Sequence, residues 1–273
     1  MAGSERELPV AVFDSGVGGL TVLHECLVSL PHEDFLYLGD TARFPYGDRS
    51  ADELLRFARE LAGILLDRGA KLLVVACNSA TAAALPALRE ELEGRVPVVS
   101  VVTPESRLAA AATANGRVGL IATPATVGSG AYARALAEAA PGAELHAVAS
   151  AELAPLIQEG GEVDERVVAC VDGLCRPLGD ADVDTVILGC THYPLVRPML
   201  QRMLGRDVRL VTAGHAVAAA AQRALEAQGL ETEGEREGEY RFLCTGDLDA
   251  FRELGTRFLQ MPLGEIEHID LAH

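Results

Sequence analysis

The sequence has almost no lysine: 23 of its 273 residues are Lys or Arg, and Lys71 is the single lysine. Chemistry that runs through pyridoxal phosphate needs a lysine to form a Schiff base with the cofactor. Lys71 opens the apolar run LLVVA, and a lysine at the start of a strand is usually a solvated edge residue. The sequence therefore argues against an enzyme with a lysine-linked cofactor.

Positive charge is scarce as well, since 40 Asp and Glu residues give the chain a formal net charge of -17. Nucleic-acid binding needs a clustered positive face, so this balance argues against a nucleic-acid partner. The same field would repel an anionic substrate. Such a substrate would have to be held locally, by backbone amides and helix N-termini.

Long apolar runs are also missing, so no segment has the length that a membrane span needs. The first residues, MAGSERELP, include acidic residues and no apolar signal core, which predicts a cytoplasmic protein with no membrane partner. With 49% hydrophobic and 23% charged residues, the composition is typical of a folded soluble chain.

The six cysteines are expected to be reduced thiols rather than a disulfide framework, because the chain is long and no signal peptide is evident. Cys170 and Cys175, followed by Cys190 and His192, could suggest a metal site. They lack the paired short spacings of a zinc module, so we expect no bound metal.

Apolar runs alternate with helical patterns along most of the chain, which is typical of an α/β fold. Most runs are continuous, as in strands buried on both faces of a parallel sheet. In such folds, ligand chemistry is expected at the carboxyl ends of strands. The predicted strands are Val10–Phe13, Phe35–Leu38, Leu72–Ala76, Val98–Val102, Val118–Ala122, Leu145–Ala149, Thr185–Leu188 and Val208–Val211, followed by a strand–helix–strand tail of Tyr240–Cys244, Asp247–Phe258 and Ile266–Leu271.

One helix has clear boundary signals. Ser50 and Glu53 have the spacing of a capping box, an apolar stripe follows, and Gly69 closes the segment. Pro86, inside the Ala-rich segment after Cys77, is expected to kink or break its helix.

The two halves of the chain resemble each other weakly. LLVVACNSA at 72–80 and TVILGCTHY at 185–193 both consist of an apolar strand, a small residue, a cysteine and polar residues. AVFDSGVGG at 11–19 and GLIATPATVGSG at 119–130 both lead from a strand into a Gly-containing loop. We therefore expect two similar α/β domains with mainly parallel sheets facing each other across a cleft. Their predicted ranges are 1–99 plus 209–273, and 100–208.

Cys77 and Cys190 end buried strands in matched contexts, which would place one thiol on each side of that cleft. Two thiols on opposite faces of a small molecule suit proton removal from carbon by one and proton return by the other, which inverts the centre. Activation of a thiolate needs a nearby base, a cation or a helix N-terminus. Asp14 and His192 could serve this purpose. Each also has a plainer interpretation, Asp14 as a helix N-cap and His192 as a hydrogen-bonded turn residue.

Further donors lie beside these groups. The glycine-rich loop from Asp14 to Gly19 could form a carboxylate-binding nest from free amides. Asn78, Ser79 and Thr191 add amide and hydroxyl groups. The segment 128–133 fits the loose dinucleotide pattern GxGxxA, but it does not directly follow its strand, and no GxxxxGK[ST] phosphate loop occurs.

At these motifs the chain resembles the glutamate racemase family. The matching segments are VFDSGVGGLTVL at 12–23, YLGDTARFPYGDRS at 37–50, VVACNSATAAAL at 74–85, PVVSVVTP at 97–104 and VILGCTHYPLV at 186–196. They occur in the order and spacing of that family over roughly the first 200 residues, whereas the last 60 or so match mainly in general pattern.

The resemblance implies a cofactor-independent enzyme that interconverts L- and D-glutamate and supplies D-glutamate for bacterial peptidoglycan, commonly as a homodimer. It implies that Cys77 and Cys190 are the acid/base thiols, supported by Asp14 and His192 respectively. In the family's usual assignment, Cys190 deprotonates L-glutamate and Cys77 deprotonates D-glutamate. The residues implied to hold the substrate are Asp14, Ser15, Pro45, Tyr46, Gly47, Asn78, Ser79, Thr191 and His192.

Some positions depart from the family pattern. Ser79 stands where threonine is usual and keeps the hydroxyl. Gln158 occupies the position of a glutamate that is sometimes given an active-site role, and Glu159 is only its neighbour. Both are left out of the predicted site.

Other functions stay open. Aspartate racemase is a relative with the same paired cysteines, but its second motif usually has Glu rather than His after Cys-Thr, so His192 favours glutamate. A two-lobed amino-acid-binding protein without catalysis would keep the donors but would not need matched thiols. A hydrolase with one catalytic thiol would leave the other cysteine unexplained.

Overall fold

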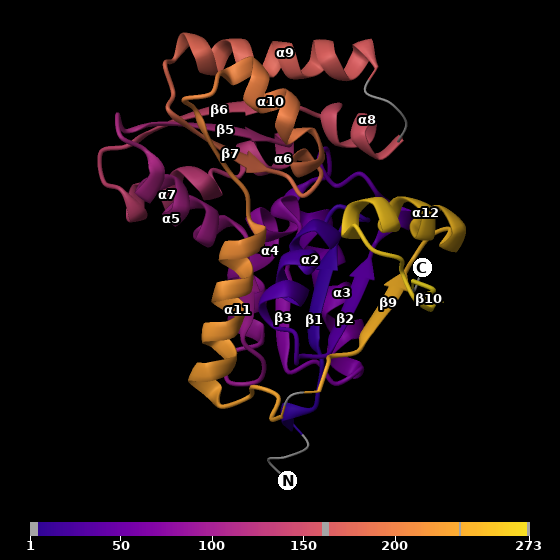
Figure 1. The fold of residues 1–273 in the computed structure, drawn as a ribbon. Coiled ribbons are helices and arrows are strands. Elements are labelled where there is room, and N and C mark those ends of the chain that lie inside the picture. The colour runs from indigo at the N-terminus through magenta and orange to yellow at the C-terminus, as the bar shows by residue number, and fades with distance from the viewer. Residues whose placement is uncertain (1–4, 160–163, 235, 272–273) are drawn as a thin grey trace.

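The structure, a computed structural model, describes residues 5–159, 164–234 and 236–271. It contains two parallel sheets, one above the other in Figure 1. The six-stranded sheet has the order β10-β9-β2-β1-β3-β4 and the four-stranded sheet the order β6-β5-β7-β8. Every pairing within them is parallel. The predicted α/β fold with two facing domains is therefore confirmed.

The strands fall where the apolar runs predict them, with ends that differ by a few residues. They are β1 (Val10–Asp14), β2 (Phe35–Gly39), β3 (Leu72–Val75), β4 (Val98–Ser100), β5 (Arg117–Ala122), β6 (Glu144–Ala149), β7 (Thr185–Gly189), β8 (Arg209–Val211), β9 (Tyr240–Cys244) and β10 (Ile266–His268).

Helices connect the strands. They are α2 (Leu20–Ser29), α3 (Ala51–Asp67), α4 (Asn78–Glu91), α5 (Val102–Ala112), α6 (Pro124–Gly128), α7 (Ala131–Ala139), α8 (Leu153–Glu159), α9 (Glu165–Asp180), α10 (Arg197–Leu204), α11 (Gly214–Gln228) and α12 (Leu248–Leu259), with short 3-10 turns η1 (Thr41–Arg43) and η2 (Tyr193–Val196). The predicted capping box is present at α3, where Ser50 accepts from the N–H of Glu53 and the Glu53 carboxylate accepts from the N–H of Ser50.

Both sheets repeat one strand order, β2-β1-β3-β4 and β6-β5-β7-β8. In each sheet, the second strand along the chain pairs with one side of the first strand, and the third strand pairs with its other side. A topological switch point therefore lies between β1 and β3 and between β5 and β7. Ligands of open α/β sheets bind at such points, outside the carboxyl ends of the strands. The matched sequence segments 72–80 and 185–193 occupy equivalent places, each consisting of a strand, β3 or β7, and the residues that follow it.

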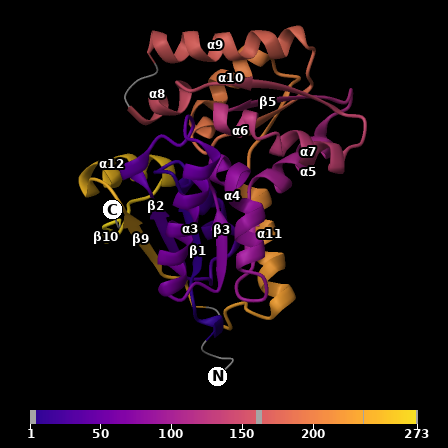
Figure 2. The ribbon, with the colours of Figure 1, turned by 180° about the vertical axis from the view of Figure 1, so that it is seen from behind.

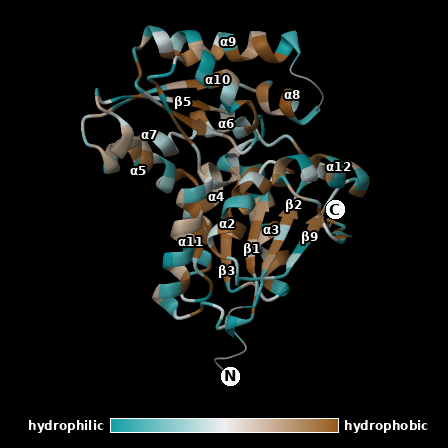
Figure 3. Ribbon diagram, in the orientation of Figure 1, coloured by the Kyte–Doolittle hydropathy of each residue, from teal (hydrophilic) through white to brown (hydrophobic). Residues whose placement is uncertain are grey.

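The larger sheet is buried on both faces. Val10 and Val12 of β1 belong to a core formed with α2, α11 and α12, whereas Ala11 and Phe13 belong to a core formed with α3 and α4. Figure 1 shows α2 and α11 on the near side, and Figure 2 shows α3 on the opposite side. The central strands are correspondingly apolar along nearly their whole length, and many hydrophilic residues lie along the outer helices (Figure 3). This burial explains why the runs do not alternate.

The predicted domain ranges differ from the sheets at their edges. Ser100 belongs to β4 of the larger sheet, although the prediction placed it in the second domain. Strand β8 pairs with β7 in the smaller sheet, although the prediction placed residues 209–211 in the first domain. Pairing with a neighbouring strand decides this membership, and the sequence pattern does not reveal it.

The structure also bears on two single-residue expectations, the kink or break at Pro86 and the solvated Lys71. Pro86 lies inside α4, which continues to Glu91 without a break. The helix is held by tertiary packing of its Ala84 and Leu88 side, which is fully buried, and such packing outweighs local propensity. Lys71 is not a solvated edge residue, because it is 4% exposed.

Lys71 precedes β3 and lies at the amino ends of the strands, the edge of the sheet away from the switch point. Its Nζ is 2.5 Å from Oε2 of Glu33, which is also buried, and donates to the hydroxyl of Thr232 at 3.1 Å. The single lysine therefore ties the start of β3 to the segment before β2 through a buried ion pair, and to the segment before β9 through a hydrogen bond.

We expect Lys71→Met to destabilise the fold by about 3–5 kcal/mol, because it leaves the Glu33 carboxylate buried without its cation. The double variant Glu33→Gln/Lys71→Met should recover most of this loss, since it removes both charges. Urea denaturation followed by circular dichroism measures both. Equal free energies of unfolding for the single variant and the wild type would contradict the prediction.

Candidate active site

The carboxyl ends of β1, β3 and β7 converge at a small cavity of about 20 Å³. All the predicted site residues except Asp14 line it. The lining consists of Ser15, Phe44, Pro45, Tyr46, Gly47, Cys77, Asn78, Ser79, Thr123, Ala151, Ala154, Pro155, Cys190, Thr191 and His192. We call this the thiol cavity, because Cys77 enters it from the larger sheet and Cys190 from the smaller one.

Asp14 ends β1 and lies just beneath the cavity, fully buried. The N–H groups of Gly16 and Gly19 donate to its Oδ2 at 3.1 and 3.0 Å, and the hydroxyl of Thr191 donates to its Oδ1 at 3.4 Å. Burial raises the pKa of Asp14 to about 6 despite these donors. The expected glycine loop is thus a nest, but it holds the carboxylate of Asp14 itself.

Two glycines of this loop have no room for a side chain, and one of them, Gly18, allows the sheets to approach. A Cβ on Gly18 would lie 2.3 Å from Oγ1 of Thr191 and 2.5 Å from Nδ1 of His192. A Cβ on Gly19 would lie 2.5 Å from Cβ of Asp14. A side chain at Gly18 would therefore push the β1 loop away from the loop that carries Cys190, whereas one at Gly19 would displace Asp14.

Cys77 is the N-cap of α4, and its sulfur accepts from the N–H of Ala80 at 3.5 Å. Burial, and to a smaller extent the nearby charge of Asp14, raise the pKa of its thiol to about 12. Hydrogen bonds from Ala80 and Ser15 oppose this rise. Cys77 therefore rests as a neutral thiol in this arrangement.

Cys190 follows β7 and is also buried, and burial raises the pKa of its thiol. Its sulfur lies 4.0 Å from Nδ1 of His192. The other ring nitrogen, Nε2, is 2.9 Å from Oε1 of Gln158. Burial lowers the pKa of His192 to about 3, so its ring is neutral at physiological pH.

The Gln158 contact sets the tautomer of His192. An amide oxygen only accepts hydrogen bonds, so Nε2 carries the ring proton and donates it to Gln158. Nδ1 is then an unprotonated acceptor directed at the Cys190 thiol. This orientation suits His192 to take the proton of Cys190.

The other side of the cavity is held by polar contacts between loops. The hydroxyl of Tyr46 donates to Asp40, whose Oδ1 also accepts from Thr245 at 2.7 Å. The hydroxyl groups of Ser79 and Thr123 are 2.8 Å apart and link α4 to the end of β5. These contacts fix groups that face the thiols.

Several residues of the site were missed. Gln158 was left out and contacts His192, and Phe44 packs its ring against His192 with centroids 5.3 Å apart. Thr123 follows β5 as Cys190 follows β7. The expectation that ligands bind at the carboxyl ends of strands could therefore have identified it. Glu159 does not line the thiol cavity; it is exposed and paired with Arg166 at 3.0 Å.

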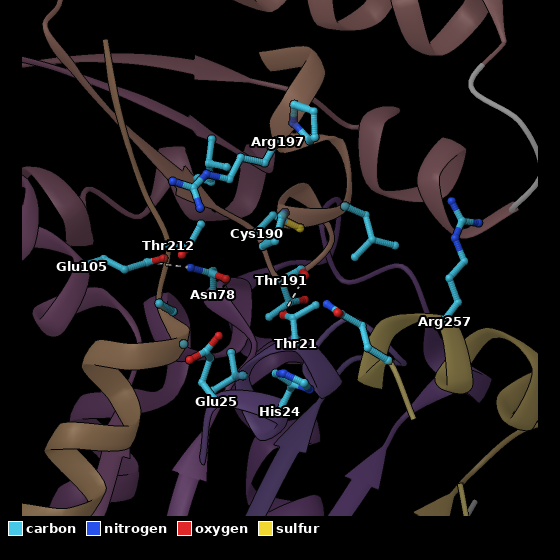
Figure 4. A pocket seen from close by; sticks show the side chains of 18 residues that line it. Thr21, His24, Glu25, Asn78, Glu105, Cys190, Thr191, Arg197, Thr212 and Arg257 are labelled. Atoms are coloured by element: carbon cyan, nitrogen blue, oxygen red, sulfur yellow. Dashed lines mark hydrogen bonds between the residues drawn. The ribbon is translucent and has the colours of Figure 1, made fainter. Parts of the chain in front are cut away.

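A larger cavity of about 430 Å³ adjoins the site on the side of α2, α10 and α11 (Figure 4). Asn78, Cys190 and Thr191 line both cavities. Figure 4 also shows Glu105, a buried carboxylate that the sequence did not single out, directed at Asn78.

Within the described ranges, no three His, Cys, Asp or Glu side chains are grouped as a metal ion would require. None of the helices that the structure describes combines the length and apolar character needed to cross a membrane.

The comparisons with known proteins agree with this geometry. The sequence model of the Asp/Glu/hydantoin racemase family matches residues 29–231. The chain belongs to this family. The motif resemblance and the class of enzyme, an amino-acid isomerase, are thereby confirmed.

Individual family members are similar over nearly the whole chain. The glutamate racemase of Beutenbergia cavernae is 45% identical over 270 residues, covering 95% of this chain and 92% of that protein. The structure of glutamate racemase isoform RacE1 from Bacillus anthracis aligns with a TM-score of 0.92 at 36% identity, covering 97% and 98% of the two chains. That of glutamate racemase from Francisella tularensis, solved with D-glutamate, aligns with a TM-score of 0.90 at 32% identity and the same coverage.

We expect Gly18→Ala to open the thiol cavity, because the added methyl group cannot fit beside Thr191 and His192. Cys190 should then react faster with iodoacetamide, as measured by peptide mass spectrometry over time. Gly173→Ala is a matched control, since a Cβ at this helical glycine meets no atom within 4 Å in the described structure. Equal labelling rates of Cys190 in the two variants would contradict the expected steric role of Gly18.

Proposed function

We propose that this enzyme interconverts L- and D-glutamate by a cofactor-independent, two-base mechanism in which Cys77 and Cys190 carry the protons. The observation that carries the proposal is that both thiols line one small cavity from equivalent strand ends of two facing sheets. The single lysine, which a Schiff base with pyridoxal phosphate would need, is held by Glu33 at the other edge of the larger sheet.

The reaction transfers one proton at each face of Cα. Starting from L-glutamate, the thiolate of Cys190 removes the Cα proton, and the electron pair is left on the carbanion. The thiol of Cys77 then donates its proton to the opposite face. The product is D-glutamate. Cys190 is now protonated as a thiol, and Cys77 is now a thiolate. The reverse direction exchanges the two roles.

Formation of the starting thiolate needs help, because burial raises the pKa of both thiols. The neutral Nδ1 of His192 is directed at Cys190 and can accept a hydrogen bond from its thiol, which weakens the S–H bond. The α-ammonium group of the bound amino acid brings a positive charge into the cavity, and an opposite charge within a few ångströms lowers the pKa of a thiol.

The lining of the thiol cavity suits an amino acid with a second carboxylate. Within the described chain this lining contains neither Lys nor Arg, so hydroxyl groups, side-chain amides and backbone N–H groups would bind the carboxylates. Ser15, Ser79 and Thr191 supply the hydroxyl groups, and the turn at Tyr46 and Gly47 closes the far end. The Francisella relative solved with D-glutamate supports this choice of substrate.

The wider role rests on the family resemblance. We propose that the D-glutamate formed supplies peptidoglycan synthesis in the cytoplasm, that the enzyme acts as a homodimer, and that each sheet with its helices is one domain. Aspartate is the competing substrate. It differs from glutamate by one methylene group, and a binding pocket discriminates by only about 1–3 kcal/mol for such a difference.

We expect Cys77→Ser and Cys190→Ser each to abolish net racemisation, because one face of Cα then lacks its acid/base group. The measurement is proton NMR of the Cα–H signal of L-glutamate, D-glutamate and aspartate in D₂O, with purified protein and no added cofactor. Cys170→Ser is a matched control, since this half-buried cysteine lies on α9 outside the cavity.

Near-normal racemisation by either thiol variant would overturn the two-base mechanism. Exchange with aspartate alone would keep the mechanism and change the substrate. No exchange with any amino acid, from folded protein with reduced thiols, would favour the binding protein without catalysis.

A bell-shaped dependence of kcat/KM on pH is expected, with its acid limb near pH 6. Asp14, whose pKa is raised to about 6, must be ionised to attract the ammonium group, so activity falls as pH decreases through this value. His192 does not titrate there, because its pKa is about 3. Asp14→Asn should lower activity and remove the acid limb. An acid limb that persists unchanged in this variant would argue against the assignment.

A further inference from the structure

A second buried cluster lies behind the thiol cavity. Glu105, in the first turn of α5, is 1% exposed. Its Oε2 accepts from Nδ2 of Asn78 at 3.1 Å and from the hydroxyl of Tyr132 on α7. Nδ2 of Asn78 also donates to the oxygen of Tyr132 at 2.6 Å. A carboxylate, a phenol and an amide thus form a closed triangle between the two sheets.

The cluster joins the two halves of the molecule. Asn78 is the first residue of α4, which follows β3 of the larger sheet, whereas α5 and α7 flank β5 of the smaller sheet. Burying a carboxylate costs free energy unless it is paired with a cation or hydrogen-bonded. The N-terminal turn of α5 stabilises the charge of Glu105 through the helix dipole, but this local effect does not require a contact with Asn78.

The hydrogen bonds fix which end of the Asn78 amide faces which way. In its ionised form, Glu105 only accepts hydrogen bonds, so above its pKa the amide nitrogen faces Glu105. Its two hydrogens then go to Glu105 and Tyr132. The amide oxygen, Oδ1, is left for other donors, and in Figure 4 it points away from Glu105, toward the side of Cys190 and Thr191.

We propose that Glu105 is a positioning residue which, with Tyr132, turns the amide oxygen of Asn78 toward the thiol cavity, where this oxygen accepts a hydrogen bond from the α-ammonium group of the substrate. The inference rests on the proposed function, because it assumes an amino-acid substrate. Asn78 touches that substrate, and Glu105 acts through it.

The same geometry makes the orientation depend on the charge of Glu105. Burial raises the pKa of Glu105 to about 8, although Tyr132 and Asn78 lower it by donating to the carboxylate. A protonated Glu105 can donate to Oδ1 of Asn78, which turns the amide nitrogen toward the cavity instead. Other titratable groups that line or border this region are Cys190 after β7, Glu25 on α2 and Arg197 on α10.

The test compares KM and kcat for glutamate in the wild type and in Glu105→Gln across the neutral and alkaline range. Gln has nearly the shape of Glu but stays neutral, so it can present either end to Asn78. Above the pKa of Glu105, KM of the variant should exceed that of the wild type by about tenfold, the size expected for a lost hydrogen bond to a charged group. The ratio of the two KM values should approach one below this pKa, and kcat should change little.

Two other variants separate positioning from stability. Tyr132→Phe removes the phenol hydroxyl and loosens the same amide, so it should raise KM in the same direction. Ser106→Ala is the matched control: Ser106 is the next residue of α5, is fully buried, and its hydroxyl has no hydrogen-bond partner among the described residues. It should leave both kinetic constants unchanged.

A ratio of KM values that stays within twofold at all pH values would overturn the inference, as would an equal effect of Ser106→Ala.

If Glu105→Gln does not fold, the NMR signals of the Asn78 side-chain amide in the wild type provide a second measurement. The variant Asn78→Asp assigns these signals. They should shift with a midpoint near pH 8, and constant signals would equally overturn the inference. Absence of glutamate turnover by the wild type would instead refute the proposed function, and the amide signals would still report the orientation of Asn78.

Discussion

The contact between the β1 loop and the loop after β7 is the constraint on which the site depends. Gly18 leaves room for Thr191 and His192 to lie directly against the first sheet, and Thr191 bonds to Asp14 across this junction. Two half-sites at separate switch points become one cavity because of this approach. A side chain at Gly18 would keep both sheets intact and still separate the thiols.

The titratable groups at this junction are buried, and burial shifts the pKa of each of them. Burial shifts the pKa of Asp14, Cys77, Cys190 and Glu105 upward and that of His192 downward, always toward the neutral form. At neutral pH the two thiols and His192 are therefore uncharged, whereas Asp14, with a pKa of about 6, is largely ionised. An amino acid that enters brings its own charges into a medium of low dielectric constant, where each interaction is strong.

The sequence predicts the elements that follow from local rules. Continuous apolar runs located the strands, and their ends located Cys77 and Cys190, because parallel strands place their carboxyl ends at one edge. Gln158, Glu105 and Tyr132 come from within helices, where nothing in the local pattern indicates which neighbour they will meet. Glu105 in particular looks like an ordinary acidic residue in a first helical turn, and tertiary packing alone gives it Asn78 and Tyr132 as partners.

The thiol cavity of about 20 Å³ holds about one water molecule, far less than an amino acid. The walls must therefore part whenever a molecule enters or leaves, and the bond from the N–H of Ala125 to the carbonyl of Gly47, 2.9 Å long, is among those that span the two sides. Under the proposed mechanism, each conversion leaves the thiols with their protonation states exchanged. In the open state, solvent can also exchange protons with the two thiols and restore their starting protonation states. The same opening motion therefore admits substrate and regenerates the enzyme for the next conversion.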